Sequence, residues 1–541
     1  MFFAVGSRAE EDIMGRLRRL RRGRGCVYRG HVEGTALVLG LCLGFVGCDS
    51  DDSADQKDDS TAREQESTAA EKDPDPTAAE VMTKSGPIAG EVVDEEGTPV
   101  HVFRGVPYAA PPVGDLRWKP PEPVEPWTEV RSATDWGDRS PQASSRLVDN
   151  GEISEDCLNL NVLTPSLEES SALPVMVFFH GGGLTIGTAN SPTYSHTALP
   201  AAENVVVVTV NQRLGPMGYL AHPALAAESE HDASGNYGVL DQIAALEWVK
   251  DNASVFGGDP DNVTIFGESG GGTKVLSCLG SPLCEGLFHR AIVQSGSRSA
   301  SEGAVTARET AEERGVMLAK KLGIDEDDPD ILEKLRAFSW EEILEASQAD
   351  DAGFVTNIAI DGWVFPQSIY DALVKGDQAN VPLIVGANKG EAAMLMSSVP
   401  ELAENMKSVS SEAYVYVFSY VPPGWRTDDC HAFHGLELPY VFGALKGLET
   451  ATIRYLGMNA GCATDTDPDP DETDEQVAAN SMKIWAEFAR TGNPSVSGLI
   501  DWPAYTSEDG QYLEIDGELA VKAGVATAGA DAPGIGGTLS Q

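Results

Sequence analysis

Cysteine and basic residues are scarce in this chain of 541 residues. Eight Cys are far too few for a scaffold held together by disulfides. Lys and Arg number 38 against 84 Asp and Glu, a formal net charge of −46, so nucleic acid is excluded as a partner because its phosphates would be repelled. Hydrophobic residues make up 42% of the sequence, which is enough for a large core and excludes global disorder.

The N-terminus has no apolar run long enough to cross a membrane. Residues 36–47 form a 12-residue apolar stretch, whereas a spanning helix needs about 20. Eight Arg precede this stretch, so residues 1–47 are predicted to be a signal peptide. Phe45-Val-Gly-Cys48 resembles a bacterial lipoprotein cleavage box, which predicts lipidation of Cys48 and an exported, cell-envelope protein. An ordinary secretory signal, giving a secreted protein, is the alternative.

The segments at either end of the chain have compositions that cannot form a core. Residues 49–80 hold twelve acidic and three basic side chains without an aromatic one, so residues 48–80 are predicted to be a solvated acidic tether. Residues 524–541 form a Gly/Ala tail. The folded domain is therefore expected between residues 84 and 523. The oligomeric state cannot be predicted from the sequence.

Short apolar, β-branched runs alternate with helical patterns through the middle of the chain. The runs lie at 175–179, 205–210, 263–266 and 383–385, and the helical patterns at 238–255 and 475–490. Continuous apolar strands are typical of a sheet that is covered on both faces. This predicts an α/β fold with a mostly parallel central sheet and helices on both faces. In such sheets the ligand site lies at the carboxyl ends of the strands.

Two glycine-rich motifs follow predicted strands. Gly267-Glu-Ser-Gly-Gly271 follows the run 263–266 and precedes a helical stretch, which predicts Ser269 as a nucleophile on a sharp strand-to-helix turn. His180-Gly-Gly-Gly183 follows the run 175–179, and bare backbone there can bring N–H donors to a developing oxyanion. Gly182, Gly183 and Gly270 are the predicted donors.

A serine nucleophile needs a base, and the base needs an acid to orient it. In the chain order Ser, acid, His of α/β-hydrolases, the candidates for the base are the three His that follow Ser269. His434 lies in a loop after a strand and is favoured over His431, whereas the surroundings of His289 indicate a structural role. For the acid, Glu391 follows a buried strand, and Asp361 is the alternative.

A series of motifs in order resembles one family, the type-B carboxylesterases in the cholinesterase-like branch of the α/β-hydrolases. Besides the two glycine motifs, the series consists of Phe103-Arg-Gly-Val-Pro-Tyr108, Glu155-Asp-Cys-Leu-Asn159, Asn211-Gln-Arg-Leu-Gly215, Gly235-Asn-Tyr-Gly238, Gln294-Ser-Gly296 and Trp485-Ala-Glu-Phe-Ala489. The bacterial, para-nitrobenzyl-esterase-like members are the nearest in kind. The resemblance implies an α/β-hydrolase that cleaves a small carboxylic ester without cofactor or metal. It assigns the same roles to Ser269, Glu391, His434, Gly182, Gly183 and Gly270.

The chain also departs from the family pattern. Gly270 replaces the usual Ala, Ala392 replaces the usual Gly, and Leu147 stands where cholinesterases have a choline-binding Trp, which argues against choline esters. Only 43 residues separate Glu391 from His434, fewer than in the family, so the helices that wall one side of the pocket should be reduced.

Cysteine pairing and metal binding remain open in the sequence. The usual disulfide partner of Cys157 is absent from this chain. Two other pairs are possible in an oxidising compartment, Cys278 with Cys284 and Cys430 with Cys462. The acidic residues 465–471 hint at calcium, but a solvated loop leading into a helix fits their spacing better.

Two other classes of function remain to be weighed. A binding or adhesion protein on the same fold would have lost the nucleophile, the acid or the base, and this chain has all three. A thioesterase or amidase would use the same triad.

Overall fold

The computed structural model describes residues 78–143, 151–296, 301, 303–349, 351–391 and 393–525. The predicted signal peptide, Cys48, Leu147, Ala392, most of the tether and most of the tail lie outside the described residues. None of the described helices is both long and apolar enough to cross a membrane.

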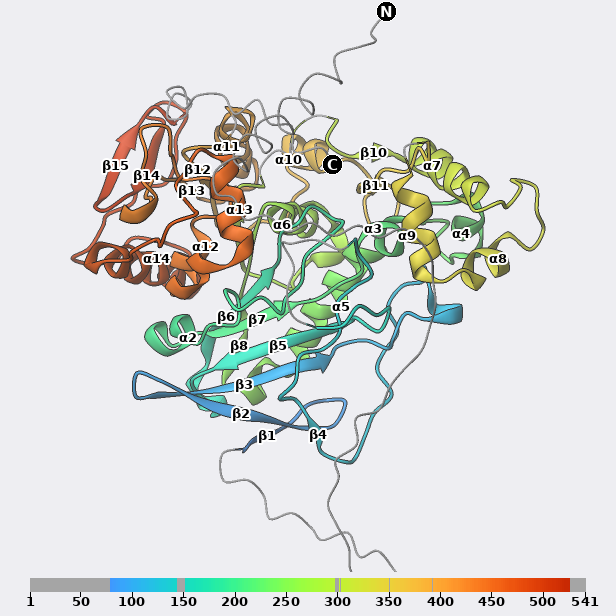
Figure 1. Ribbon diagram of the computed structural model, residues 1–541, viewed down its shortest axis with the longest axis horizontal. Helices are drawn as coiled ribbons and strands as arrows, with labels where there is room; N and C mark the ends of the chain where they lie inside the picture. The colour runs from blue at the N-terminus through green and yellow to red at the C-terminus, as the bar shows by residue number, and fades with distance from the viewer. Residues whose placement is uncertain are drawn as a thin grey trace, which may run out of the picture. The chain divides into compact units, whose positions relative to one another are not determined.

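A large twisted sheet runs through the described domain (Figure 1). Its strands, in spatial order, are β1 (Ala78–Met82), β2 (Pro87–Glu95), β3 (Thr98–Pro107), β5 (Asn159–Thr164), β7 (Val206–Val210), β6 (Leu173–Phe179), β8 (Gly258–Glu268), β9 (Arg290–Gln294), β12 (Leu383–Asn388), β13 (Ala413–Phe418), β14 (Gln511–Ile515) and β15 (Leu519–Ala523), with β4 (Arg131–Ser132) beside β2. From β7 to β14 every neighbouring pair is parallel, whereas the pairs on either side of that run are antiparallel, apart from the short pair of β2 with β4. The predicted mostly parallel sheet is confirmed.

Helices cover both faces of this sheet. Alternate side chains of each central strand point to opposite sides, so apolar strands present a hydrophobic surface on both faces. In β6, Val175, Val177 and Phe179 belong to one hydrophobic cluster, and Met176 and Phe178 belong to the other. The first cluster includes side chains of α5 (Tyr237–Asn252), α6 (Gly270–Gly280) and α10 (Ile369–Lys375). The second includes α2 (Ala198–Glu203), α12 (Leu438–Val441) and α14 (Glu472–Thr491). The helices therefore enclose a core on each side of the sheet.

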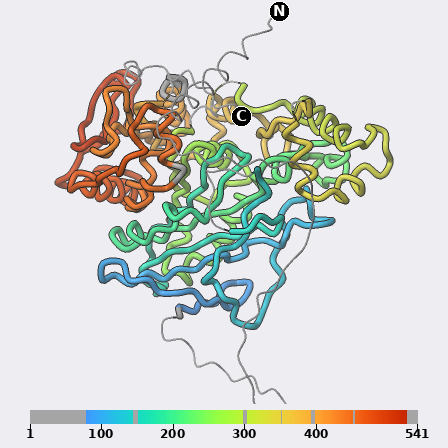
Figure 2. The backbone as a smooth tube through the Cα atoms, in the orientation of Figure 1, coloured from blue at the N-terminus to red at the C-terminus, as the bar shows by residue number. Residues whose placement is uncertain are grey.

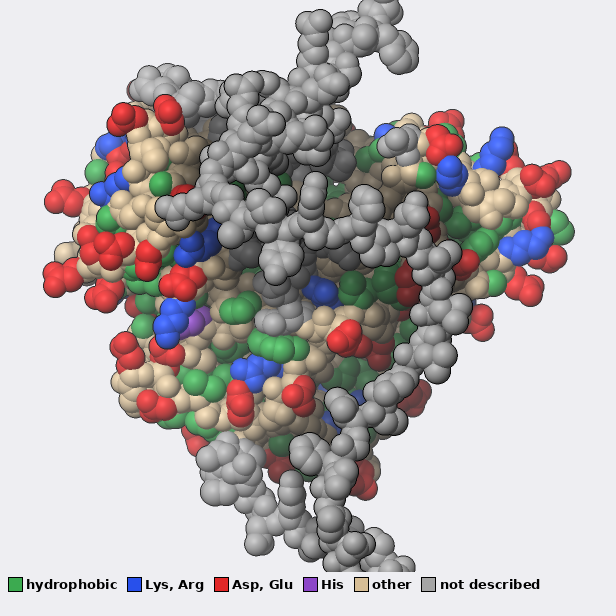
Figure 3. All heavy atoms as spheres, in the orientation of Figure 1, with side chains coloured by type: hydrophobic (Ala, Val, Ile, Leu, Met, Phe, Trp, Pro, Cys, Tyr) green, Lys and Arg blue, Asp and Glu red, His purple; other side chains and the backbone are tan. Residues whose placement is uncertain are grey.

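The remaining helices include a group between residues 308 and 348, at the right of Figure 2, and one at residues 393–405 that packs against β12 and β13. They are α3 (Gly215–Tyr219), α4 (Pro223–Glu228), α7 (Arg308–Lys321), α8 (Ile331–Ala337), α9 (Trp340–Gln348), α11 (Ala393–Asn405) and α13 (Ala451–Asn459), and a small two-stranded sheet pairs β10 (Thr306–Ala307) with β11 (Ala359–Ile360). Acidic side chains dominate the charged surface that Figure 3 shows.

The folded domain extends slightly beyond the expected limits. Strand β1 pairs with β2 from Ala78 onward, and Ala79 and Val81 are buried, so residues 78–80 belong to the sheet rather than to the tether. At the other end, the N–H of Gly524 donates to Gly510 O at 2.9 Å, and Val525 is buried. Only a few apolar side chains mark these two ends, and they lie within polar or Gly-rich sequence. The hydrophobic pattern is therefore too short to predict where the folded domain begins and ends.

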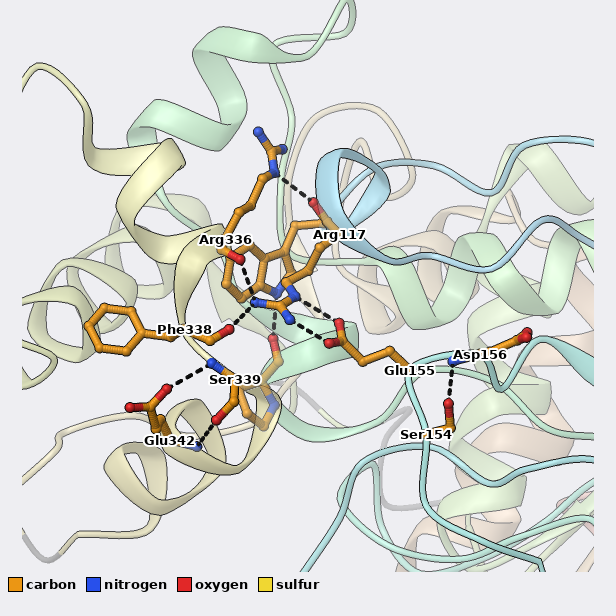
Figure 4. Close-up of polar contacts among 10 residues, drawn as sticks. Arg117, Ser154, Glu155, Asp156, Arg336, Phe338, Ser339 and Glu342 are labelled. Carbon is orange, nitrogen blue, oxygen red and sulfur yellow. Dashed lines mark hydrogen bonds and ion pairs between the residues drawn. The ribbon is translucent and has the colours of Figure 1, made fainter.

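A buried arginine joins the helical segment after β10 to the body of the domain (Figure 4). The guanidinium of Arg117 forms a bidentate ion pair with Glu155 and donates to the carbonyls of Arg336, at 3.2 Å, and Phe338, at 2.7 Å. Both charged side chains are nearly inaccessible to solvent. Glu155, in the Glu155-Asp-Cys motif, therefore holds the guanidinium of Arg117, which in turn fixes the backbone that leads from α8 into α9.

Replacing Glu155 by Gln should destabilise the protein by about 3 kcal/mol, because it leaves the Arg117 charge buried without its partner. The free energy of unfolding from urea titration is the measurement. Glu487→Gln, which breaks the solvent-exposed pair with Arg490, is the control and should cost less than about 1 kcal/mol. Equal losses in the two variants would show that the Arg117 pair is not a buried constraint.

Candidate active site

Ser269 sits on a strained turn between β8 and α6. Its φ of 59° and ψ of −121° are rarely adopted by a residue with a side chain, and its N–H donates to Gln294 O at 2.8 Å. The flanking glycines make the turn possible. A Cβ on Gly267 would collide with the backbone of Gly271, and a Cβ on Gly271 would collide with Phe179 O. The predicted strand-to-helix turn is thus present, with the serine at its apex.

The loop after β6 lies against the start of α6. Gly182 and Gly183 have φ values of 94° and 65°, and Gly182 O accepts from Ile186 N at 3.1 Å. Within the described residues no hydrogen bond occupies the N–H of Gly182 or Gly183. A Cβ on Gly270 would collide with Gly183 O. The departure at position 270 is therefore a requirement of this loop, and not merely a tolerated change of Ala to Gly.

His434 and Glu391 are brought together from separate loops. His434 Nδ1 is hydrogen-bonded to Glu391 Oε1. The other carboxylate oxygen of Glu391 accepts from Ser295 Oγ and from the N–H of Asn388, each at 2.9 Å. Ser295 belongs to the Gln294-Ser-Gly296 motif, which thus orients the carboxylate. The acid is almost fully buried, and about a quarter of the histidine side chain is exposed.

The second ring nitrogen of His434 faces Glu268, a residue to which the sequence motifs assign no role. His434 Nε2 lies 3.2 Å from Glu268 Oε1, and within the described residues no hydrogen bond joins His434 to Ser269. Glu437 is also buried beside the pair, and its carboxylate accepts from Asn388 Nδ2 at 2.5 Å and from Gln294 Nε2 at 3.3 Å. The position of Glu268, next to the nucleophile, is the only signal in the sequence that could have drawn attention to it.

This group of carboxylates changes the pKa values of the site. Burial raises the pKa of Glu268 to about 8 and that of Glu437 to about 7. Burial lowers the pKa of His434, but Glu268 and Glu391 outweigh that effect and raise it to about 10. The neighbouring carboxyl groups therefore favour the protonated imidazole of His434.

The alternative residues are engaged elsewhere. The ring of His289 accepts the N–H of Val263 at 3.1 Å, which is the structural role expected for it. Asp361 Oδ1 accepts from the N–H groups of Trp363, at 3.1 Å, and Phe365, at 2.9 Å, and so closes its own turn. His431 lies beside a disulfide and has no contact with Glu391 among the interactions of the described residues.

One of the two possible disulfides is formed. Cys430 bonds to Cys462 across a segment that contains His434. Cys278 and Cys284 are free thiols, so the second possible disulfide is not formed. Cys278 lies in α6 and Cys284 just after it, and both are packed in the hydrophobic core. Cys157 is also a free, buried thiol, as expected from its missing partner.

The acidic segment 465–471 leads into α14, as the sequence predicted. Asp471 caps this helix by accepting from the N–H groups of Thr473, at 2.8 Å, and Asp474, at 3.3 Å. These bonds satisfy backbone donors that the first turn of a helix leaves free.

A parallel sheet with a serine on a strained turn, a glycine loop against it and a Glu–His pair defines the α/β-hydrolase class. The carboxylesterase family model matches residues 77–402 and 393–530, so the chain belongs to this family and is a carboxylic-ester hydrolase. The resemblance seen in the sequence is confirmed.

Individual relatives cover most of the chain. Para-nitrobenzyl esterase of Bacillus subtilis (strain 168) is 34% identical over 501 residues, 82% of this chain and 96% of the relative. Liver carboxylesterase of Sus scrofa is also 34% identical, over 80% of this chain and 89% of its own length. Among solved structures, a thermophilic PNB esterase superposes with a TM-score of 0.68 at 31% identity, covering 82% of this chain and 97% of that structure.

Glu268→Gln should shift the acidic limb of the pH profile of kcat/KM to lower pH by about one to three units. The Glu268 carboxylate stabilises the protonated imidazole of His434, so its removal should lower the pKa of His434 and leave the neutral imidazole present at lower pH. The measurement is kcat/KM for an uncharged p-nitrophenyl ester between pH 5 and 10, with the exposed Glu487→Gln as control. If the acidic limb of the pH profile stayed in place or moved to higher pH, the coupling between Glu268 and His434 would be contradicted.

Proposed function

We propose that Ser269, His434 and Glu391 are the catalytic triad of this esterase, with the N–H groups of Gly182, Gly183 and Gly270 as its oxyanion hole. The observation that carries the proposal is the contact between His434 Nδ1 and Glu391 Oε1 beside the strained turn at Ser269. An acid on Nδ1 fixes the tautomer that leaves Nε2 free to accept a proton.

The proposed reaction has two half-reactions. Ser269 Oγ attacks the ester carbonyl as His434 Nε2 takes its proton, and the oxyanion receives hydrogen bonds from the three glycine N–H groups. The imidazolium then protonates the leaving alcohol, which departs and leaves an acyl-enzyme. Water activated by His434 attacks the acyl group and releases the carboxylic acid. Before the first step, His434 Nε2 must exchange its contact with Glu268 for one with Ser269 Oγ.

Ser269→Ala, His434→Ala and the double variant should each lose kcat by about 10⁴-fold or more, and the losses should not add, because the triad acts as a unit. Glu391→Gln should keep the fold and lower kcat, whereas Asp361→Asn should leave kcat nearly unchanged. Hydrolysis of p-nitrophenyl acetate is the measurement, and a fluorophosphonate probe should label Ser269 covalently. Turnover by folded Ser269→Ala protein would refute the assignment.

The same assay separates the alternatives. Glu268, Glu391 and His434 present potential metal ligand atoms within 4.8 Å of one another, so the assay is repeated after EDTA treatment. The proposed steps need no metal, and kcat/KM should be unchanged. Parallel panels of esters, thioesters and anilides rank the leaving groups. Failure to hydrolyse any of them, with intact folding, would favour a binding protein.

We also propose that the enzyme is an envelope lipoprotein anchored through Cys48. The proposal is supported by the basic stretch, the 12-residue apolar run and the acidic segment that flank this cysteine. The disulfide between Cys430 and Cys462 is consistent with folding in an oxidising compartment.

If the anchor exists, the protein should incorporate a labelled fatty acid and remain with membranes in high salt, since acyl chains rather than charge hold it there. Cys48→Ser should abolish the label and either release the protein or block its processing. Cys42→Ser, within the apolar run, is the control and should keep the label. A mature N-terminus other than Cys48 would identify a freely secreted enzyme.

A further inference from the structure

A buried lysine without an acidic partner lies directly behind the glycine loop. Lys274 is in the second turn of α6, five residues after Ser269, and its side chain is inaccessible to solvent. Within the described residues it forms no ion pair, and burial lowers its pKa well below the usual value. Burying an amine costs far more than burying a hydrocarbon chain of the same length. Its N–H donors therefore need an explanation.

The amine of Lys274 has two oxygen partners. Nζ donates to His180 O at 2.9 Å, the carbonyl at which β6 ends and the glycine loop begins. In the amide orientation that satisfies all its contacts, Gln212 Oε1 accepts from Lys274 Nζ at 2.5 Å and from His180 Nε2 at 3.0 Å, and the Gln212 amide nitrogen donates to Val210 O at 3.1 Å. A neutral amine has two N–H groups, so these two oxygens satisfy it.

These contacts fix the start of a loop that has few other restraints. His180 O anchors the loop at its start, and Leu184 O accepts from the N–H of Gly215 at 2.7 Å at its far end. Between these points Gly182 and Gly183 have positive φ and no side chains to pack. A helical side chain leans toward the N-terminus of its helix, so Lys274 reaches back to the level of Gly270 and Gly271. One helix thus carries the nucleophile and holds the loop.

We propose that Lys274 is a positioning residue for the oxyanion hole. Its amine holds the loop 180–183 through His180 O, so that the N–H groups of Gly182 and Gly183 face the oxygen bound at Ser269. The inference rests on the proposed oxyanion hole. Donors of this kind act in the transition state, when charge develops on the oxygen, so their displacement should lower kcat more than it weakens substrate binding.

The test is Lys274→Met, which keeps the length of the side chain and removes its donors. We expect kcat for p-nitrophenyl acetate to fall by about 10- to 100-fold while KM changes by less than about threefold. The affinity for a trifluoromethyl ketone, which binds Ser269 as an oxyanion, should fall in parallel with kcat. The affinity for the matching non-fluorinated ketone should not change.

Two variants provide the comparison. Ser277→Ala lies one turn further along α6, where the buried hydroxyl donates only to Thr273 O at 2.9 Å, so it should lower the melting temperature and leave kcat unchanged. Gly270→Ala pushes directly on Gly183 O and should reproduce the kinetic pattern of Lys274→Met. If Lys274→Met does not fold, Lys274→Gln replaces it in the test. Gln is shorter than Lys but keeps N–H donors on its amide, so we expect a loss of kcat smaller than that of Lys274→Met.

The outcomes separate the two proposals. If folded Lys274→Met, or Lys274→Gln in its place, keeps kcat and trifluoromethyl ketone affinity within about twofold of the parent, Lys274 is only structural and the inference is wrong. If Ser269→Ala still turns over, the proposed nucleophile fails whatever Lys274 does. Loss of kcat in the Lys274 variant together with an inactive Ser269→Ala supports both.

Discussion

The close approach of α6 to the end of β6 is the constraint on which the site depends. Only a residue without Cβ can occupy position 271, because the carbonyl of Phe179 fills the space. This approach turns the chain sharply at Ser269 and places the loop after β6 beside the start of the helix. Ser269, the proposed nucleophile, and the predicted oxyanion donors therefore share one piece of backbone geometry, and a change that separates α6 from β6 would disturb both.

The sequence predicted those parts of the site that depend on local pattern and chain order. The turn at Ser269 follows from glycines at fixed spacing after an apolar strand, and the Glu391–His434 contact follows from the order in which the class arranges its triad. The parallel centre of the sheet could be predicted for the same reason, because buried strands alternate with helical patterns. These features follow from local motifs and from the order of the motifs along the chain.

Features built from distant residues could not be predicted in this way. Nothing near Lys274 in the sequence indicates that its amine meets His180 O, which lies 94 residues earlier. Spacing also failed for the cysteines: the pair six residues apart stays reduced, whereas Cys430 and Cys462, 32 residues apart, are bonded. The approach of Glu268, at the end of β8, to His434 likewise depends on elements that meet only in the folded chain, whereas Glu437 is only three residues from the histidine.

The carboxylates around His434 also bear on how the reaction ends. An ester enters the site as a neutral molecule, but its acid product leaves as an anion at neutral pH. Glu268, Glu391 and Glu437 all lie beside His434, in a chain of net charge −46. A negative charge on any of these groups repels the carboxylate product, most strongly where water is excluded. The arrangement therefore favours release of the product and limits inhibition by the acid that accumulates.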